Sequence, residues 1–327
     1  MRARKAIVGI SAAILALSFV LGAAQGAVAA PAATTSHASP SPELSRISAQ
    51  FERGAFPVQG IAAKSTKTLC SDLSIDASSD WTYSKGYAYV EDWYTGDITL
   101  CGNGVDVLVA TPPSGYSNDG YYGMAGVVVS GQLDLILLSF DVQGGWYCFD
   151  ASASGCLGGS AGFTFPSSFC SSEPNGYCNP DGVVVKSNLV FTYVDVVNIE
   201  LVTCSAYASS CANDPASSAF AGYTPLGITQ KGTKLYVTDN SCTGNIWEGT
   251  TAKMHVLYTE GNSLEAISFH GKLLYVGDDA ICGGNAGILN AKTGVELATP
   301  LSGAYEINGL DTDLQWTVPF AYEVLSS

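Results

Sequence analysis

The chain has 327 residues, with 29 Asp and Glu against 14 Lys and Arg, and its formal net charge is −15 at pH 7. Nucleic-acid binding needs a basic face that displaces counterions from phosphates, so this balance disfavours a nucleic-acid partner. Charged residues make up only 13% of the chain, while Gly and Tyr are frequent, which favours strands and turns.

Residues 1–30 have the features of a secretory signal peptide. The basic start MRARK precedes an uncharged apolar run at 6–24, and the segment Ala27-Val28-Ala29 fits a cleavage site. An uncleaved membrane anchor is the alternative, but the run is rich in small residues rather than Leu and Ile. No later stretch is apolar enough to span a membrane. The sequence therefore predicts a secreted or periplasmic protein.

Residues 31–54 follow as an Ala/Pro/Ser/Thr-rich tether that ends in a short helix. The tether composition cannot bury a core. Pro42 at a first helical position, with Leu44, Ile47 and Phe51 on one face, predicts the helix. The remainder, residues 55–327, is predicted to be one folded domain.

A repeated phrase organises this domain. LYVTDNSC at 235–242 returns as LLYVGDDAIC at 273–282. Six segments, here called hairpin lines, share one pattern: a short apolar strand, then a polar turn, then a second strand rich in Tyr, Val and Leu. This pattern predicts a hairpin. The six lines are 80–92, 126–141, 182–195, 227–239, 266–278 and 309–321.

The spacing of the lines predicts a β-propeller. Their starting points lie 39 to 56 residues apart, enough for four short strands per period. We expect a single all-β propeller of six blades, with seven as the alternative because the 126–182 interval is long. Strand-like stretches at 55–63 and 68–76 would pair with the last hairpin, so that strands from both termini close the ring and cover its edges.

The segment 225–303 resembles the YVTN type of propeller repeat. Leu235-Tyr236-Val237-Thr238-Asp239 matches the repeat closely, and Leu274-Tyr275-Val276-Gly277-Asp278 matches it together with Lys292-Thr293-Gly294. The resemblance fades in the earlier blades. It implies the fold but no single activity, because such repeats occur in cell-surface proteins, binding proteins and a few lactonase-like enzymes.

The second strand of five lines ends at an aspartate: Asp92, Asp141, Asp195, Asp239 and Asp278. One interpretation is a ring of carboxylates that binds a cation such as Ca²⁺, with Asp239 and Asp278 as the metal candidates. The favoured interpretation is structural, because an Asp after a strand accepts backbone N–H bonds and fixes the turn. No other cofactor is expected.

All ten cysteines lie in the exported part, which predicts disulfides. The short spacings predict the pairs Cys148–Cys156, Cys170–Cys178 and Cys204–Cys211. Cys242 and Cys282 occupy matching places in successive blades and are predicted to join them. Cys70 and Cys101 remain as the fifth pair.

No catalytic residue is predicted. Gly158-Gly159-Ser160-Ala161-Gly162 fits G-x-S-x-G but lies in a flexible loop rather than in a strand–turn–helix elbow. His255 has no evident nucleophile beside it, and His270 stands in a tight turn.

Aromatic and amide side chains near the strand ends suit a sugar, although packing between blades explains most aromatic residues better. We therefore expect a non-catalytic module that binds an extracellular protein, glycan or small molecule through its loop face. The alternative is a lactonase-like hydrolase or lyase that acts on a small molecule in the central channel. The candidate ligand-binding residues are Asp92, Trp93, Asp141, Asp195, Asp239, Asn240, Asn245, Trp247, Asp278, Asp279 and Asn285.

Overall fold

The computed structural model describes residues 78–84, 87–92, 95–102, 105–116, 120–259, 263–270, 272–278, 285–302, 305–306, 310–311, 321–322 and 325–326. The predicted signal peptide, tether, short helix and N-terminal strands lie outside these residues. Within the described ranges, no helix is long and apolar enough to cross a membrane.

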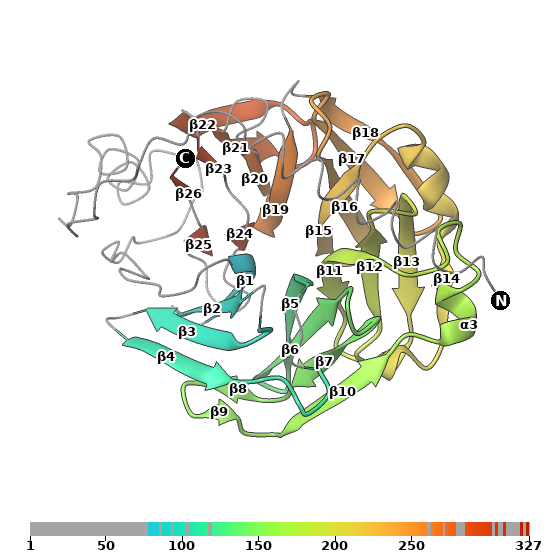
Figure 1. Cartoon of the computed structure of the whole chain (residues 1–327). Coiled ribbons are helices and arrows are strands. Elements are labelled where there is room, and N and C mark those ends of the chain that lie inside the picture. The colour runs from blue at the N-terminus through green and yellow to red at the C-terminus, as the bar shows by residue number, and fades with distance from the viewer. Residues whose placement is uncertain are drawn as a thin grey trace, which may run out of the picture. The chain divides into compact units, whose positions relative to one another are not determined.

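The described chain folds into five antiparallel sheets of four strands each, here called blades 1 to 5 in chain order (Figure 1). Blade 1 comprises β1 (Ser78–Ser84), β2 (Tyr87–Asp92), β3 (Ile98–Gly102) and β4 (Val105–Ala110). Blade 2 comprises β5 (Tyr121–Val129), β6 (Gln132–Ser139), β7 (Gly144–Cys148) and β10 (Ser160–Thr164). Blade 3 comprises β11 (Pro180–Val185), β12 (Phe191–Asp195), β13 (Glu200–Cys204) and β14 (Cys211–Asn213).

Blade 4 comprises β15 (Pro225–Lys231), β16 (Lys234–Asp239), β17 (Asn245–Thr250) and β18 (Lys253–Thr259). Blade 5 comprises β19 (Leu264–His270), β20 (Leu273–Asp278), β21 (Asn285–Asn290) and β22 (Glu296–Ser302). Two short ladders follow: β23 (Tyr305–Glu306) pairs with β26 (Leu325–Ser326), and β24 (Leu310–Asp311) pairs with β25 (Ala321–Tyr322).

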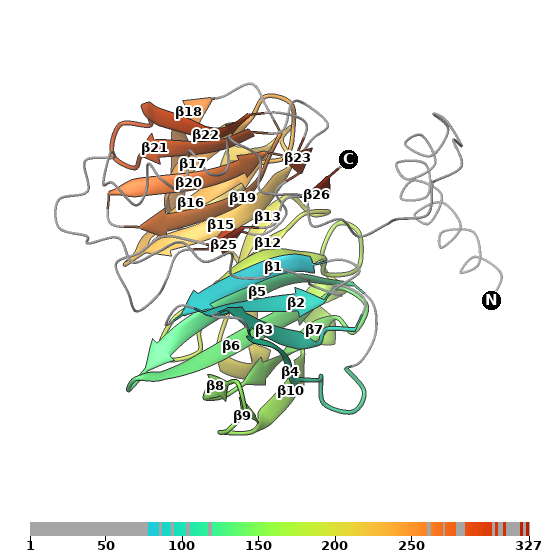
Figure 2. The ribbon, with the colours of Figure 1, turned by 90° about the vertical axis from the view of Figure 1, so that its left-hand side faces the viewer.

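Short strands and helices lie in the connections within and between the blades. A hairpin of β8 (Ala151–Ser152) and β9 (Gly155–Cys156) leaves blade 2 and lies beside β4 of blade 1 (Figure 2). The helices are α3 (Ser167–Cys170) between blades 2 and 3, η1 (Ala206–Ala208) within blade 3, and η2 (Pro215–Phe220) between blades 3 and 4.

The first strands of successive blades are neighbours, so β1, β5, β11, β15 and β19 form the inner row around one axis (Figure 1). The architecture is therefore a β-propeller, and the predicted hairpins match the first two strands of each described blade. At one end, which we call the loop face, the second strand connects to the third through residues 92–98, 139–144, 195–200 and 239–245. The opposite end, which carries the turn of each first hairpin, is the turn face.

The hydrophobic core lies between the blades rather than within them. Aromatic residues dominate the contact of blades 2 and 3, where Tyr147, Phe163, Phe165, Phe191 and Tyr193 are buried together. Similar clusters join blades 1 and 2, blades 3 and 4, and blades 4 and 5. Burial of one such side chain contributes about 1.5–3 kcal/mol, so each interface stabilises both of its blades.

Each inner strand carries an irregularity in its pairing close to the loop face. In blades 2, 3 and 4 a glycine lies there: Gly123, Gly182 and Gly227. A Cβ on Gly123 would meet the carbonyl oxygen of Asp181 in the next blade, and one on Gly227 would meet that of Glu265. The missing side chain lets neighbouring inner strands approach to backbone contact near the axis.

Three disulfides close short segments: Cys148–Cys156, Cys170–Cys178 and Cys204–Cys211. They are the three pairs that the short spacings predict, and they indicate that the chain folds in an oxidising compartment. Cys242 is also disulfide-bonded, but Cys282 lies outside the described residues, so that pairing stays a prediction. Cys70 and the side chain of Cys101 lie outside them too.

Candidate functional site

The aspartate at the end of each second strand has a common partner in the sheet. Asp92, Asp195, Asp239 and Asp278 each pair with the first residue of the preceding inner strand. In blade 2 the residue at this position is Ser139, which pairs with Tyr121. Asp141 therefore lies two residues beyond the repeat position, because β6 ends earlier than the sequence pattern indicates.

Two of these aspartates are buried and hold the loop face together. Asp195 accepts bonds from the backbone N–H groups of Asn179 at 3.1 Å and Asn198 at 3.0 Å. Asp239 accepts bonds in the same way from Thr224 and Ser241, each at 3.0 Å, and from the Ser241 hydroxyl. Each carboxylate thus joins the segment that enters its blade to the turn that follows the second strand.

This geometry supports the structural interpretation of the repeated aspartate. In the part of the chain that the structure describes, no group of three Cys, His, Asp or Glu side chains is arranged to hold a metal ion. Asp92 accepts a bond from the N–H of Thr95 at 3.0 Å. Burial raises the pKa of Asp195, and the bonds from Asn198 and Asn179 oppose that rise.

Three other predicted ligand residues make contacts within the protein. Trp247 is 1% exposed and contacts the rings of Phe220 and Tyr223 edge-on, so it does not present a ring at the surface as the ligand-binding prediction requires. Asn245 is buried beside Asp239 and accepts a bond from Thr259. Asn240 accepts bonds from the Ser263 hydroxyl.

The side chains of four remaining candidates lie outside the described residues. Trp93 and Asp279 lie outside the described residues, as do the side chains of Asp278 and Asn285. Their role as ligand-binding residues stays a prediction.

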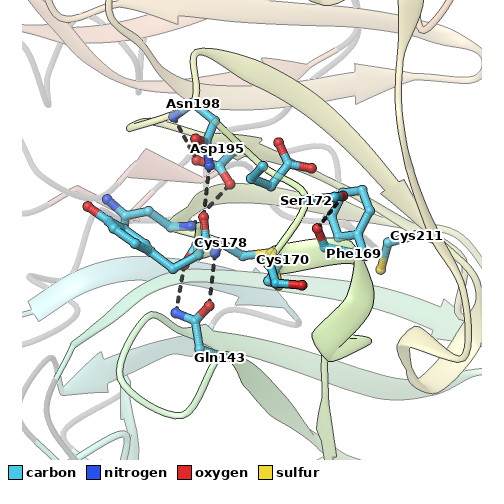
Figure 3. The surroundings of a disulfide bond; sticks show 12 residues. Gln143, Phe169, Cys170, Ser172, Cys178, Asp195, Asn198 and Cys211 are labelled. Carbon is cyan, nitrogen blue, oxygen red and sulfur yellow. Dashed lines mark hydrogen bonds between the residues drawn. A yellow bond between two sulfur atoms is a disulfide. The ribbon is translucent and has the colours of Figure 1, made fainter. Parts of the chain in front are cut away.

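The loop face carries a feature that the ligand prediction did not include: the segment from Cys170 to Cys178, here called the stapled loop. Its disulfide lies where α3 ends and β11 approaches (Figure 3). Gln143, from the β6–β7 turn of blade 2, donates to the Cys178 carbonyl at 2.7 Å and accepts from the Cys178 N–H at 2.8 Å. The loop is thereby tied to blade 2.

Blade 3 holds the other side of the stapled loop. Asn198 donates to the Tyr177 carbonyl at 2.9 Å, while its own side-chain oxygen accepts the N–H of Asn175 at 3.2 Å. The Asn175 amide also donates to the Val197 carbonyl. Pro174, Asn175 and Gly176 at the tip remain exposed. The result is an ordered surface loop with a solvent-facing tip.

A carboxyl pair joins this loop to blade 3. Glu173, only 5% exposed, accepts from the Asn213 amide, and its carboxyl lies close to that of Glu200. Burial, with the neighbouring carboxyl of Glu173 as the second cause, raises the pKa of Glu200 to about 7. Burial and the nearby carboxylates also raise the pKa of Tyr193 far above its ordinary value.

The sequence contains only part of the signal for this site. The spacing of Cys170 and Cys178 predicts a closed loop, but Gln143 lies 35 residues before the backbone group that it holds. No local pattern distinguishes this glutamine from an exposed one.

No protein-family model matches the sequence, and no curated protein matches it significantly. Among solved structures, one chain of a nidogen–laminin complex has a TM-score of 0.53 at 12% identity, over 75% of this chain and 84% of that chain. A catalytically inactive variant of virginiamycin B lyase from Staphylococcus aureus, with quinupristin, has a TM-score of 0.51 at 14% identity, over 82% and 83%. At these identities the likeness shows the β-propeller fold alone.

Proposed function

We propose that the chain is an exported, non-catalytic β-propeller that binds an extracellular partner through the stapled loop on its loop face. The observation that carries this proposal is the fixation of one surface loop by a disulfide and by side chains from two blades. A loop ordered before binding loses little conformational entropy on association, so its exposed tip is suited to recognition. A protein partner suits this exposed tip better than a small molecule, which needs a concave pocket.

The described loop-face residues favour binding over catalysis. Asp195 and Asp239 accept bonds from backbone donors, and Glu173 of the stapled loop is bonded to Asn213 of blade 3. His255 lies on β18, the outermost strand of blade 4. A hydrolase or lyase would need a general base that converges with other polar groups at the channel mouth.

We also infer that a sixth blade closes the ring. We infer further that the repeats are of the YVTN type and that the protein is secreted or periplasmic. The short strand β24 lies beside both β19 of blade 5 and β1 of blade 1. An inner strand at this place completes the row around the axis. Deletion of residues 55–76 should then prevent stable folding, because the sixth blade would lose its outer strands. Unchanged thermal unfolding of the deletion variant would refute this closure.

The binding proposal is tested at the tip of the stapled loop. The double variant Pro174→Arg, Asn175→Arg should lose retention of surface proteins from the producing cells on an immobilised propeller. The control is Ser209→Arg, Ser210→Arg, which places the same charges on the Cys204–Cys211 loop at the turn face.

Selective loss in the tip variant supports the proposal. Equal retention by both variants, or no retained protein with the wild type, overturns it. Turnover of lactone or glycoside substrates by the wild type would favour the enzymatic alternative instead.

A further inference from the structure

The turn face carries all the lysines whose side chains the structure describes. Each one is exposed and lies at or beside a hairpin turn of blades 3, 4 or 5. The chain as a whole is strongly acidic, so this placement separates its charges. The six residues are Lys186, Lys231, Lys234, Lys253, Lys272 and Lys292. We call this set the lysine face.

Contacts between neighbouring blades show that the lysine face is continuous. Gln230, next to Lys231, donates to the carbonyl of Val185, next to Lys186, at 2.9 Å. The ammonium group of Lys231 lies 4.3 Å from the ring centre of Phe269 in blade 5. These contacts align the turns of three successive blades at the same end.

The two turns of blade 5 are linked as well. The N–H of Ala291 donates to the Lys272 carbonyl at 2.9 Å, which brings the turns that carry Lys272 and Lys292 together. Lys253 lies at the equivalent outer turn of blade 4. The lysines therefore cover both the inner and the outer turns of this sector.

Few described carboxylates neutralise these charges. Glu248 is bonded to Lys234, and Asp214 lies within the electrostatic reach of Lys186. The carboxylates Asp181, Asp195, Asp239 and Glu265 belong to the same blades but lie at the loop-face end.

The length of a strand separates the two ends electrostatically. β16 has six residues and therefore spans about 20 Å at 3.3 Å per residue. Charges are screened over roughly 8 Å at physiological ionic strength. An anionic surface that touches the turns of blades 3 to 5 is therefore screened from the carboxylates at the loop face. Asp134 and Asp150 lie at the turn-face end of blade 2, outside the sector that carries the lysines.

The chemistry of the lysine face fits a planar anionic surface. Lysine acts as a flexible point charge and does not make the bidentate contacts by which arginine recognises individual phosphates or carboxylates. The same end also exposes Tyr207 and Val295, at 46% and 57%. Aromatic and aliphatic groups among lysines are typical of proteins that rest on a lipid interface.

We propose that the lysine face docks this propeller onto a membrane surface rich in anionic lipid. A flat bilayer can contact the turns of three blades at once, whereas one polymer strand would follow only a few of them. In this orientation the stapled loop points away from the bilayer. The inference does not depend on what the loop face binds.

The test is co-sedimentation of the disulfide-bonded protein, recovered from an exporting host, with vesicles. Phosphatidylcholine vesicles with phosphatidylglycerol should bind it, pure phosphatidylcholine vesicles should not, and binding should weaken as salt rises. The triple variant Lys253→Gln, Lys272→Gln, Lys292→Gln should bind about a hundred-fold more weakly, since each surface lysine contributes about five-fold. These positions leave the contacts of Lys231 and Lys234 intact.

The control variant is Ser167→Glu, Ser168→Glu, Ser171→Glu, which changes the net charge equally but at the loop face. Its vesicle binding should stay near that of the wild type. The proposal is overturned if both variants lose binding equally, if the lysine variant binds as the wild type does, or if the wild type ignores phosphatidylglycerol. Binding to soluble dextran sulfate without binding to vesicles would overturn it in favour of an anionic polysaccharide.

Discussion

The side-chain amide of Gln143 and the backbone of Cys178 exchange two hydrogen bonds, at 2.7 and 2.8 Å, between different blades. The amide thus acts like an extra peptide group that pairs with the stapled loop. Gln143 holds this position with a φ of 49°, in the left-handed region that non-glycine residues seldom occupy. The strain indicates that surrounding contacts define the turn.

Gln143→Ala should loosen the stapled loop. The N–H and C=O of Cys178 would lose their partners, which costs about 1–3 kcal/mol in the free energy of unfolding. Limited proteolysis should cleave near Asn175 faster than in the wild type. The control is Gln132→Ala, because Gln132 donates only to Asp150 at the surface and its loss should cost less than about 0.5 kcal/mol. Equal effects of the two substitutions would contradict the bridging role.

Asp239→Ala should destabilise the propeller, and it should not change the effect of calcium on the melting temperature. The substitution removes the acceptor of bonds from Thr224 and Ser241, at a cost of about 2–3 kcal/mol. Chemical denaturation measures the change. Asp141→Ala is the control, since Asp141 is exposed and lies beyond the repeat position. A rise in the melting temperature of the wild type with calcium, lost in Asp239→Ala, would favour the cation site instead.

Gly227→Ala should strain the contact of blades 4 and 5. The new Cβ would lie 2.2 Å from the carbonyl oxygen of Glu265, so the inner strands must move apart. Overpacking of this kind costs about 1–3 kcal/mol. At the matching place in blade 5, Ala266→Gly should cost less than about 1 kcal/mol, because a Cβ already fits there. Unchanged thermal unfolding of Gly227→Ala would refute the close approach.

The free energy of unfolding should fall as the pH rises from about 4.5 to about 7. Burial raises the pKa of both Glu200 and Asp181 to about 7, above their ordinary values of 4.5 and 3.8. The folded state therefore binds more protons in this window, and the stability that these protons provide is lost as they leave. Above pH 7 the contribution of these two groups should level off.

Glu200→Gln should flatten this pH dependence, because an amide cannot titrate and can still donate to Glu173. Urea denaturation at a series of pH values measures the effect. Asp141→Asn should leave the dependence as in the wild type. An unchanged slope in Glu200→Gln would show that the carboxyl pair does not bind the proton.

Part of the fold can be predicted from the sequence. Each hairpin line contains its two strands and turn within about fifteen residues, and the lines recur, so local patterning predicts the blades. The short-range disulfides are predictable for the same reason. The end of β6 is not, since a serine there replaces the aspartate of the other blades and Asp141 follows two residues later.

The candidate site is harder to predict from the sequence, because its contacts join residues of different blades. Trp247 and Asn245 stand near loop-face strand ends, yet packing of η2 and bonding with Asp239 bury them. The lysines are scattered along the sequence and form one face only when three blades stand side by side.

The sequence by itself determined the repeat, the strand pairs and the closed cysteine loops, because these depend on residues close together in the chain. Only the tertiary structure decided which aspartates hold turns, which glutamine ties the stapled loop and where the positive charge collects. Those properties arise from groups brought together by the packing of one blade against the next, and side-chain periodicity carries no information about them.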